Sequence, residues 1–174
     1  MKTNLEAKII YPESVQIELK GGKILVSGPL GRVEKEFFGP TINIKKEDGS
    51  VVLSCKNASK HDKMILNTIK SLLKNMINGV KSGFQAKLKI CSGHFPMNVS
   101  VSGNELLIKN FMGEKVARKA VVLPNVKVKV EGDIIIVSGF DKETVGQTYA
   151  NIEKATYVVN KDRRVFQDGI YLIK

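Results

Sequence analysis

The residues best suited to chemistry lie in one segment near the end of the chain, residues 161–173, which we call the tail. It contains three cations within four residues and then two aromatics: Lys161, Arg163, Arg164, Phe166 and Tyr171. The pair Asp168-Gly169 between the aromatics predicts a tight turn. Lysine and arginine bind phosphate oxygens and aromatic rings stack on bases, so this composition is typical of a surface that contacts nucleic acid.

A second interpretation of the tail is a C-terminal strand that docks on the protein core. Its anchors would be Val165, Ile170, Leu172 and Ile173, and its charges would lie in solvent. The two interpretations are compatible, because apolar residues can anchor a segment whose cations point outward.

The charge of the whole chain favours a polyanionic partner. Its 174 residues include 28 Lys and Arg against 17 Asp and Glu, a net charge of +11. Such an excess favours nucleic acid, although a merely basic soluble protein or one that lies on anionic lipid would share it. No apolar run approaches the length of a membrane-spanning helix, and the first residues lack the apolar core of a signal peptide. We therefore expect a cytoplasmic protein with no membrane partner.

The residues that could support catalysis or metal binding are few. His61 is expected in solvent at a helix start, and His94, in the loop Gly93–Met97, is expected to be a hydrogen-bonded structural side chain. Cys55 and Cys91 lack the spacing of zinc ligands and are expected to be buried thiols. The sequence therefore predicts no enzyme, no metal, no cofactor and no small-molecule substrate.

One glycine-rich segment has the spacing of a phosphate-binding loop. Gly28-Pro-Leu-Gly31 resembles the G-x-x-G loop of KH domains, which clamps a nucleotide backbone. That loop lies between helices, whereas this segment lies between predicted strands. A plain β-turn is the favoured interpretation.

The elements that must position these residues follow a pattern that occurs twice. Alternating apolar and polar residues predict strands over 15–20, 23–27 and 32–38, with a turn at Gly21-Gly22. The same pattern recurs 82 positions later, where Gly103-Asn104 takes the place of this turn. We therefore expect an α+β fold made of two tandem copies of a small unit, each with short antiparallel strands packed on one helix, over residues 1–81 and 82–174.

Each copy ends in a predicted amphipathic helix. The first is expected to begin at a cap, Ser59, with Asp62 three residues later, and to end at Gly79. Its predicted buried stripe consists of Ile65, Ile69, Leu72, Leu73, Met76 and Val80. The second helix is expected to begin near Asp141, with a stripe of Val145, Tyr149, Ile152 and Thr156.

Copy two adds two segments that copy one lacks: the residues from Tyr157 onward, which include the tail, and a loop at residues 110–115. Because the repeated core lacks these two segments, we expect them to have a role other than forming that core. Cations near the loop and in the tail form a candidate RNA-binding set: Lys115, Arg118, Lys119, Lys154, Lys161, Arg163 and Arg164.

Three motifs in copy two resemble a known family. They are Gly93-His-Phe-Pro-Met97, Asn110-Phe-Met-Gly-Glu114 and Lys161-Asp-Arg-Arg-Val-Phe-Gln-Asp-Gly-Ile-Tyr171. Together with the duplication, they resemble large-subunit ribosomal protein six in its archaeal and eukaryotic form. The resemblance implies a structural protein that binds ribosomal RNA near the sarcin-ricin loop and the base of the lateral stalk, beside neighbouring ribosomal proteins.

The resemblance also implies which residues contact RNA. They are Lys161, Arg163, Arg164, Phe166, Gln167 and Gly169 in the tail, with Lys115 and Arg118 beside the loop. Two departures are visible: the Gly-Lys-Gly loop of bacterial relatives is absent, and Met112 stands where leucine is expected. The alternative from another class is an adaptor whose basic surface binds an acidic protein.

Overall fold

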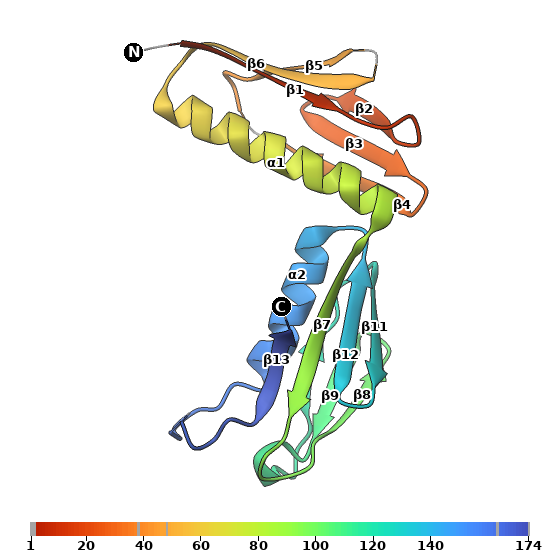
Figure 1. Cartoon of the computed structure of the whole chain (residues 1–174), viewed down its shortest axis with the longest axis vertical. Coiled ribbons are helices and arrows are strands. Elements are labelled where there is room, and N and C mark those ends of the chain that lie inside the picture. Colours follow the sequence, from red (N-terminus) through yellow and green to blue (C-terminus); the bar gives the residue numbers. More distant parts are fainter. Residues whose placement is uncertain (1–2, 38, 48, 163, 174) are drawn as a thin grey trace. The chain divides into compact units, whose positions relative to one another are not determined.

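The computed structural model describes residues 3–37, 39–47, 49–162 and 164–173 (Figure 1). The chain divides into two compact units, Met1–Gly83 (unit 1) and Phe84–Lys174 (unit 2). Each unit contains antiparallel strands and one α-helix, which confirms the α+β class and the tandem duplication. Phe38, the predicted end of a strand, and Arg163 of the tail lie outside the described residues.

Unit 1 consists of two three-stranded antiparallel sheets and one helix. Its elements are β1 (Thr3–Ile10), β2 (Gln16–Lys20), β3 (Lys23–Gly28), β4 (Gly31–Glu36), β5 (Asn43–Glu47), β6 (Ser50–Ala58) and α1 (Lys60–Ser82). The sheet orders are β1-β6-β5 and β2-β3-β4. Gly28 pairs with Gly31 across the turn between β3 and β4, so this segment is the simple β-turn that was favoured over a KH-type loop.

Unit 2 repeats this arrangement with one strand more. Its elements are β7 (Phe84–Cys91), β8 (Asn98–Ser102), β9 (Glu105–Lys109), the 3-10 helix η1 (Phe111–Gly113), β10 (Arg118–Val121), β11 (Val126–Glu131), β12 (Ile134–Gly139), α2 (Lys142–Ala155) and β13 (Gly169–Ile173). The sheet orders are β10-β9-β8 and β11-β12-β7-β13. Figure 1 shows β13 beside β7. Strand β13 and η1 have no counterpart among the described elements of unit 1.

Helix α1 begins where the sequence predicts. The Ser59 side chain accepts a hydrogen bond from the Asp62 backbone N–H at 3.2 Å, and the Asp62 carboxylate accepts the Ser59 N–H at 2.8 Å, which is the predicted capping box. Hydrogen bonds from the Ser59 side chain and then from the Thr41 hydroxyl lower the pKa of Asp62 to about 2.

The predicted end of α1 is wrong, whereas four of the six residues of its predicted stripe are buried: Ile69, Leu73, Met76 and Val80. The helix continues past Gly79 to Ser82, and Gly83, at φ 73°, donates its N–H to the Gly79 carbonyl. Packing overrides the cost of an internal glycine, which is only about 1 kcal/mol. Leu66 and Ile77, which were not predicted, are also buried, whereas the predicted Ile65 and Leu72 are half-buried. The buried face of α1 is therefore centred on a slightly different side of the helix than the sequence predicts.

Helix α2 begins as predicted at Asp141, which accepts the Glu143 N–H at 3.1 Å. Val145 and Ile152 are buried, and Tyr149 is half-buried. The last residue of the predicted stripe, Thr156, lies at the C-cap and is 3% exposed.

Candidate nucleic-acid interface

The tail ends as a strand at the edge of the four-stranded sheet. Strand β13 pairs antiparallel with β7, and the Ile170 N–H also donates to the Thr156 hydroxyl at 2.9 Å. Ile170 is fully buried, which confirms it as an anchor. The other three predicted anchors are wrong: Val165 is 61% exposed, Leu172 37% and Ile173 43%. The docked-strand interpretation therefore holds for the last residues of the tail only.

The predicted turn at Asp168-Gly169 is also wrong, because the turn lies earlier in the tail. The Asp162 carbonyl accepts the N–H groups of Val165 at 3.1 Å and Phe166 at 2.9 Å. The Asp162 carboxylate accepts the backbone N–H and the guanidinium of Arg164, and these hydrogen bonds lower the pKa of Asp162. Asp162 therefore makes the turn that the Asp-Gly pair was expected to make.

Asp168 fixes the base of the tail. Its carboxylate is 2% exposed and accepts the backbone N–H groups of Gly93 and His94 and a contact from His94 Nδ1 at 2.5 Å. Burial alone would raise the pKa of Asp168, but the hydrogen bonds from His94 and Gly93 outweigh it and the pKa is lowered. Sequence reasoning missed this role, because no local signal links Asp168 to residues 74 and 75 positions away.

His94 also supports Phe166. The two rings stack with centroids 5.0 Å apart and planes 29° apart, and Lys161 Nζ lies 4.8 Å from the Phe166 ring centroid. The interpretation of His94 as a hydrogen-bonded structural side chain is therefore confirmed. Phe166 is half-buried, so contacts within the protein already cover part of its ring.

Three polar residues of the tail, Lys161, Arg164 and Gln167, are exposed. The Arg164 side chain is 90% exposed. The Gln167 amide donates to the Arg164 carbonyl at 3.2 Å. Gly169 is buried under the Tyr171 ring, where an added Cβ would lie 2.9 Å from the Tyr171 hydroxyl. The glycine is therefore needed for packing within the tail.

The loop after β9 is shaped by unusual backbone angles and by Arg118. Asn110 and Met112 adopt φ angles of 59° and 52°, and Phe111 is 1% exposed. The Arg118 guanidinium lies 4.3 Å from the Phe111 ring centroid and donates to both carboxylate oxygens of Glu114. It also donates to the carbonyls of residues 155 at 2.9 Å and 157 at 3.2 Å. Arg118 thus joins the loop to the start of the segment that leads into the tail.

The three segments that carry the family resemblance meet in space. Gly93 and His94 bind Asp168 of the tail, as described above. The Asn110 amide donates to the Pro96 carbonyl at 3.0 Å, and the Phe95 ring packs against Gly113. Residues 93–97 therefore connect the tail to the loop that contains Asn110. Lys115 is exposed on that loop and forms no ion pair within the described part of the chain.

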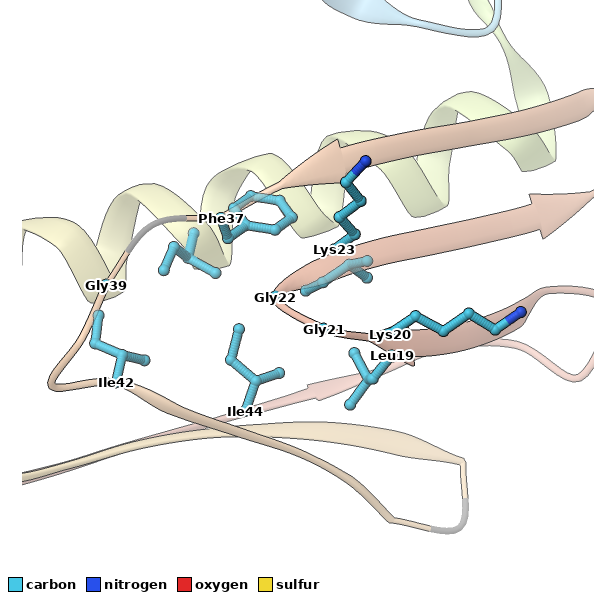
Figure 2. Close-up of a pocket in the computed structure, with 11 residues that line it drawn as sticks. Leu19, Lys20, Gly21, Gly22, Lys23, Phe37, Gly39, Ile42 and Ile44 are labelled. Atoms are coloured by element: carbon cyan, nitrogen blue, oxygen red, sulfur yellow. The ribbon is translucent and has the colours of Figure 1, made fainter.

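Unit 1 contains a pocket whose described lining lacks catalytic side chains. This pocket of about 280 Å³ is lined, among the described residues, by apolar side chains, glycines, Lys20 and Lys23 (Figure 2). These two lysines pair with Glu18 at 2.8 Å and Glu34 at 3.4 Å. The described lining contains no histidine, cysteine, serine or carboxylate that could act as a base or nucleophile.

The described residues contain no group of three or more His, Cys, Asp and Glu side chains placed to hold a metal. Cys55 is buried as predicted, but Cys91, the last residue of β7, is half-buried. Within the residues searched, no helix is long and apolar enough to cross a membrane.

Known proteins are similar to this chain along nearly its whole length. The model of the family "Ribosomal protein L6" matches residues 11–83 and 95–169, one stretch in each unit. The large ribosomal subunit protein uL6 of Methanosarcina mazei is 44% identical over 174 residues, which covers 100% of this chain and 99% of the relative. The protein of that name from Aeropyrum pernix is 46% identical over 166 residues, which covers 95% of this chain and 91% of the relative.

Proposed function

The chain belongs to the ribosomal protein L6 family, and we propose that its second unit holds ribosomal RNA of the large subunit mainly through the tail. Membership of this family makes the protein a structural constituent of the large ribosomal subunit, in the cytoplasm, and not an enzyme. Its partners are accordingly ribosomal RNA and other ribosomal proteins. The family assignment favours this function over an adaptor for acidic proteins.

The observation that carries the proposal is a set of exposed cations next to residues that are buried and hydrogen-bonded to other segments. Lys161 and Arg164 are exposed, while the buried Asp168 accepts the N–H groups of Gly93 and His94, and the buried Ile170 donates its N–H to the Thr156 hydroxyl. A contact surface that is ordered before binding loses less conformational entropy when RNA arrives. The tail therefore presents its charges at low entropic cost.

Each residue of the set has its own role in the proposal. Lys161, Arg164 and the neighbouring Arg163 contact phosphates, and Lys115 does the same from the loop. Gln167 bonds to a sugar or base edge, and Phe166 and Gly169 hold the tail in shape. Arg118 acts indirectly, because its guanidinium already bonds to Glu114 and to two carbonyls of unit 2.

The position on the ribosome is the finer part of the proposal. The contact lies near the sarcin-ricin loop and the base of the lateral stalk, with neighbouring ribosomal proteins of the stalk base as further partners. What supports this location is the family resemblance of the three motifs at residues 93–97, 110–114 and 161–171.

The test is the binding of the purified protein to isolated large-subunit ribosomal RNA over a range of salt concentrations. The variant Lys161→Ala with Arg164→Ala should bind more weakly, and the slope of log affinity against log salt should fall by about two, one for each phosphate contact. The matched control, Lys63→Ala with Lys74→Ala, removes the same charge from exposed positions of α1. A salt slope that is equal in the wild type and the tail variant would exclude the tail as the contact.

A further inference from the structure

The four-stranded sheet of unit 2 has one buried and one open face. Leu88, Ile135 and Val137 point into the core and are fully buried. The residues between them in sequence point the other way, because side chains alternate along a strand. This outward face carries four exposed lysines, which we call the lysine face: Lys87, Lys89, Lys127 and Lys129.

Strand register fixes how the four lysines are arranged. Lys129 and Lys87 lie in one row on either side of Ile136, and Lys89 lies in the next row beside Ile134. Neighbouring strands are about 4.8 Å apart, so the columns on β7 and β11 are roughly 10 Å apart, with the central strand β12 between them. The lysines therefore form two parallel columns along a shallow apolar strip.

Among its described residues, the lysine face has more cations than carboxylates. Glu131, opposite Ile134, is the single carboxylate at the described outward positions of these rows. Among the residues that the structure describes, neither Glu131 nor any of the four lysines takes part in an ion pair. Four cations on one face of a sheet repel each other, and an anion that binds across them relieves this repulsion.

On the equivalent face of unit 1 the central strand β6 is covered. There, Lys8 on β1 and Glu47 on β5 form an ion pair at 3.5 Å. Both strands pair with β6, on opposite sides, so the ion pair passes over β6. The outward residues Ser50 and Val52 of β6 are only 1% and 7% exposed. In unit 2 the corresponding Ile134 is 39% exposed, so its face is open as well as cationic.

The lysine face continues into the tail. A hollow of about 780 Å³ is lined by Lys89 of the sheet and by Gln167 and Tyr171 of the tail, with Asp133 also at its wall. A chain that contacts the tail can therefore reach Lys89 without leaving the surface of unit 2.

We propose that the lysine face binds the sugar-phosphate backbone of the ribosomal RNA that the tail contacts. This inference rests on the proposed function and adds a second surface to it. Lysine is depleted at the centre of protein interfaces, whereas it serves as a point charge for phosphates, so the four lysines favour RNA over a protein partner. The exposed apolar strip at Ile134 suits the sugars between phosphates.

The first experiment compares two variants with the wild type in binding to isolated large-subunit ribosomal RNA. One carries Lys87→Gln, Lys89→Gln, Lys127→Gln and Lys129→Gln, and the other carries Lys161→Ala with Arg164→Ala. The lysine-face variant should lose about tenfold or more in affinity near 0.15 M salt, and its salt slope should fall by about three. A matched control replaces four exposed lysines of α1 by glutamine: Lys60, Lys63, Lys74 and Lys81.

The outcomes separate the two proposals. If the tail variant weakens binding but the lysine-face variant binds like the wild type, the lysine face is not a contact and the proposed function stands. If neither variant changes binding, the proposed function fails too. An equal loss in the α1 control would assign the effect to net charge and overturn the inference.

The second experiment uses only the wild-type protein, so its result does not depend on whether a variant folds. Lysines of the wild-type protein are acetylated chemically in the free state, in complex with isolated ribosomal RNA and in the intact large subunit, and modified sites are measured by mass spectrometry. Protection of the four lysines by isolated RNA supports the proposal. Protection in the intact subunit alone would assign the face to a neighbouring protein, and no protection in either would make it a solvated surface; both results overturn the inference.

Discussion

The sheets around β6 in unit 1 and β12 in unit 2 have the same kind of residue on their inward faces and different residues on their outward faces. In the sheets around β6 and β12, the central inward pairs Val51 and Leu53, and Ile135 and Val137, are all fully buried apolar residues. At the outward positions with the same register, unit 1 has Glu6, Ile10 and Asn43, and unit 2 has Gln85, Lys89 and Lys127. Each of these three differences makes the net charge of this face more positive by one in unit 2.

This difference separates the requirements of folding from those of binding. The inward positions must fill one core in each unit, and close packing tolerates little change there. The outward positions carry no such constraint, so one face could become neutral and covered by the Lys8–Glu47 pair while the other stayed open and cationic. Unit 2 also has the tail, which ends in β13, and the loop with η1, and the tail and this loop carry candidate contacts with RNA.

The largest effect is expected at the base of the tail, which is present in unit 2 alone. Asp168→Ala leaves the N–H groups of Gly93 and His94 without their acceptor in a buried site, which should cost about 2–4 kcal/mol of stability. Hydrogen exchange should show faster exchange in β13 and β7 and no change in α1. Faster exchange in α1 as well would contradict the expectation that Asp168 stabilises unit 2 and not unit 1.

The control for this prediction is Asp168→Asn, which keeps one acceptor oxygen and should lose less stability. The wild type should also be acid-sensitive at this site. The pKa of Asp168 is lowered, so its contribution is present above the ordinary value of 3.8 and is lost as the pH falls through the lower folded-state value. The stability difference between the wild type and Asp168→Ala should therefore shrink on acidification below about pH 3.8.

The next effect comes from copying the unit 1 face into unit 2. The triple change Gln85→Glu, Lys89→Ile and Lys127→Asn should lower affinity for isolated ribosomal RNA about tenfold, because it removes two phosphate contacts and adds a repelling carboxylate. The fold should be unchanged, because all three side chains are exposed. Binding is measured by salt titration, and thermal unfolding checks the fold.

The reverse change tests whether position or net charge matters. Adding Glu6→Gln, Ile10→Lys and Asn43→Lys to the triple variant restores the net charge of the wild type. We expect affinity to stay low, because the Lys8–Glu47 pair still covers the centre of that face in unit 1. Full recovery of the affinity for RNA would show that net charge alone governs binding. The difference between the two faces would then have no effect on binding.

Sequence alone predicted much of the fold for a physical reason. Alternation in strands and 3.6-residue spacing in helices record which side chains are buried, and the glycines at Gly21-Gly22 and Gly103 record turns with positive φ. The capping box at Ser59 is likewise a local signal. The end of α1 was missed because packing of the last turn on the sheet overrides the local tendency of Gly79.

The site was less predictable because its key contacts are long-range. The exposed cations of the tail could be recognised from composition, but their support could not. Asp168 looks like a turn residue in sequence, and Arg118 looks like a free surface cation. Only the fold brings Asp168 to His94 and places the Arg118 guanidinium against two carbonyls at the end of α2. Whether these cations touch RNA stays a prediction.

The smallest effect concerns the starts of the two helices. Asp62 completes a capping box in α1, whereas at the start of α2 the Asp141 side chain accepts the Glu143 N–H at 3.1 Å. Because the pKa of Asp62 is lowered to about 2, its contribution is present above 3.8 and is lost as the pH falls towards 2. The chemical shift of the Ser59 amide proton, followed by NMR, should titrate with a midpoint near 2. Thr41→Ala removes one of the two hydroxyl donors and should move that midpoint upward, towards 3.8, while a midpoint already at 3.8 in the wild type would contradict the capping box as the source of the shift.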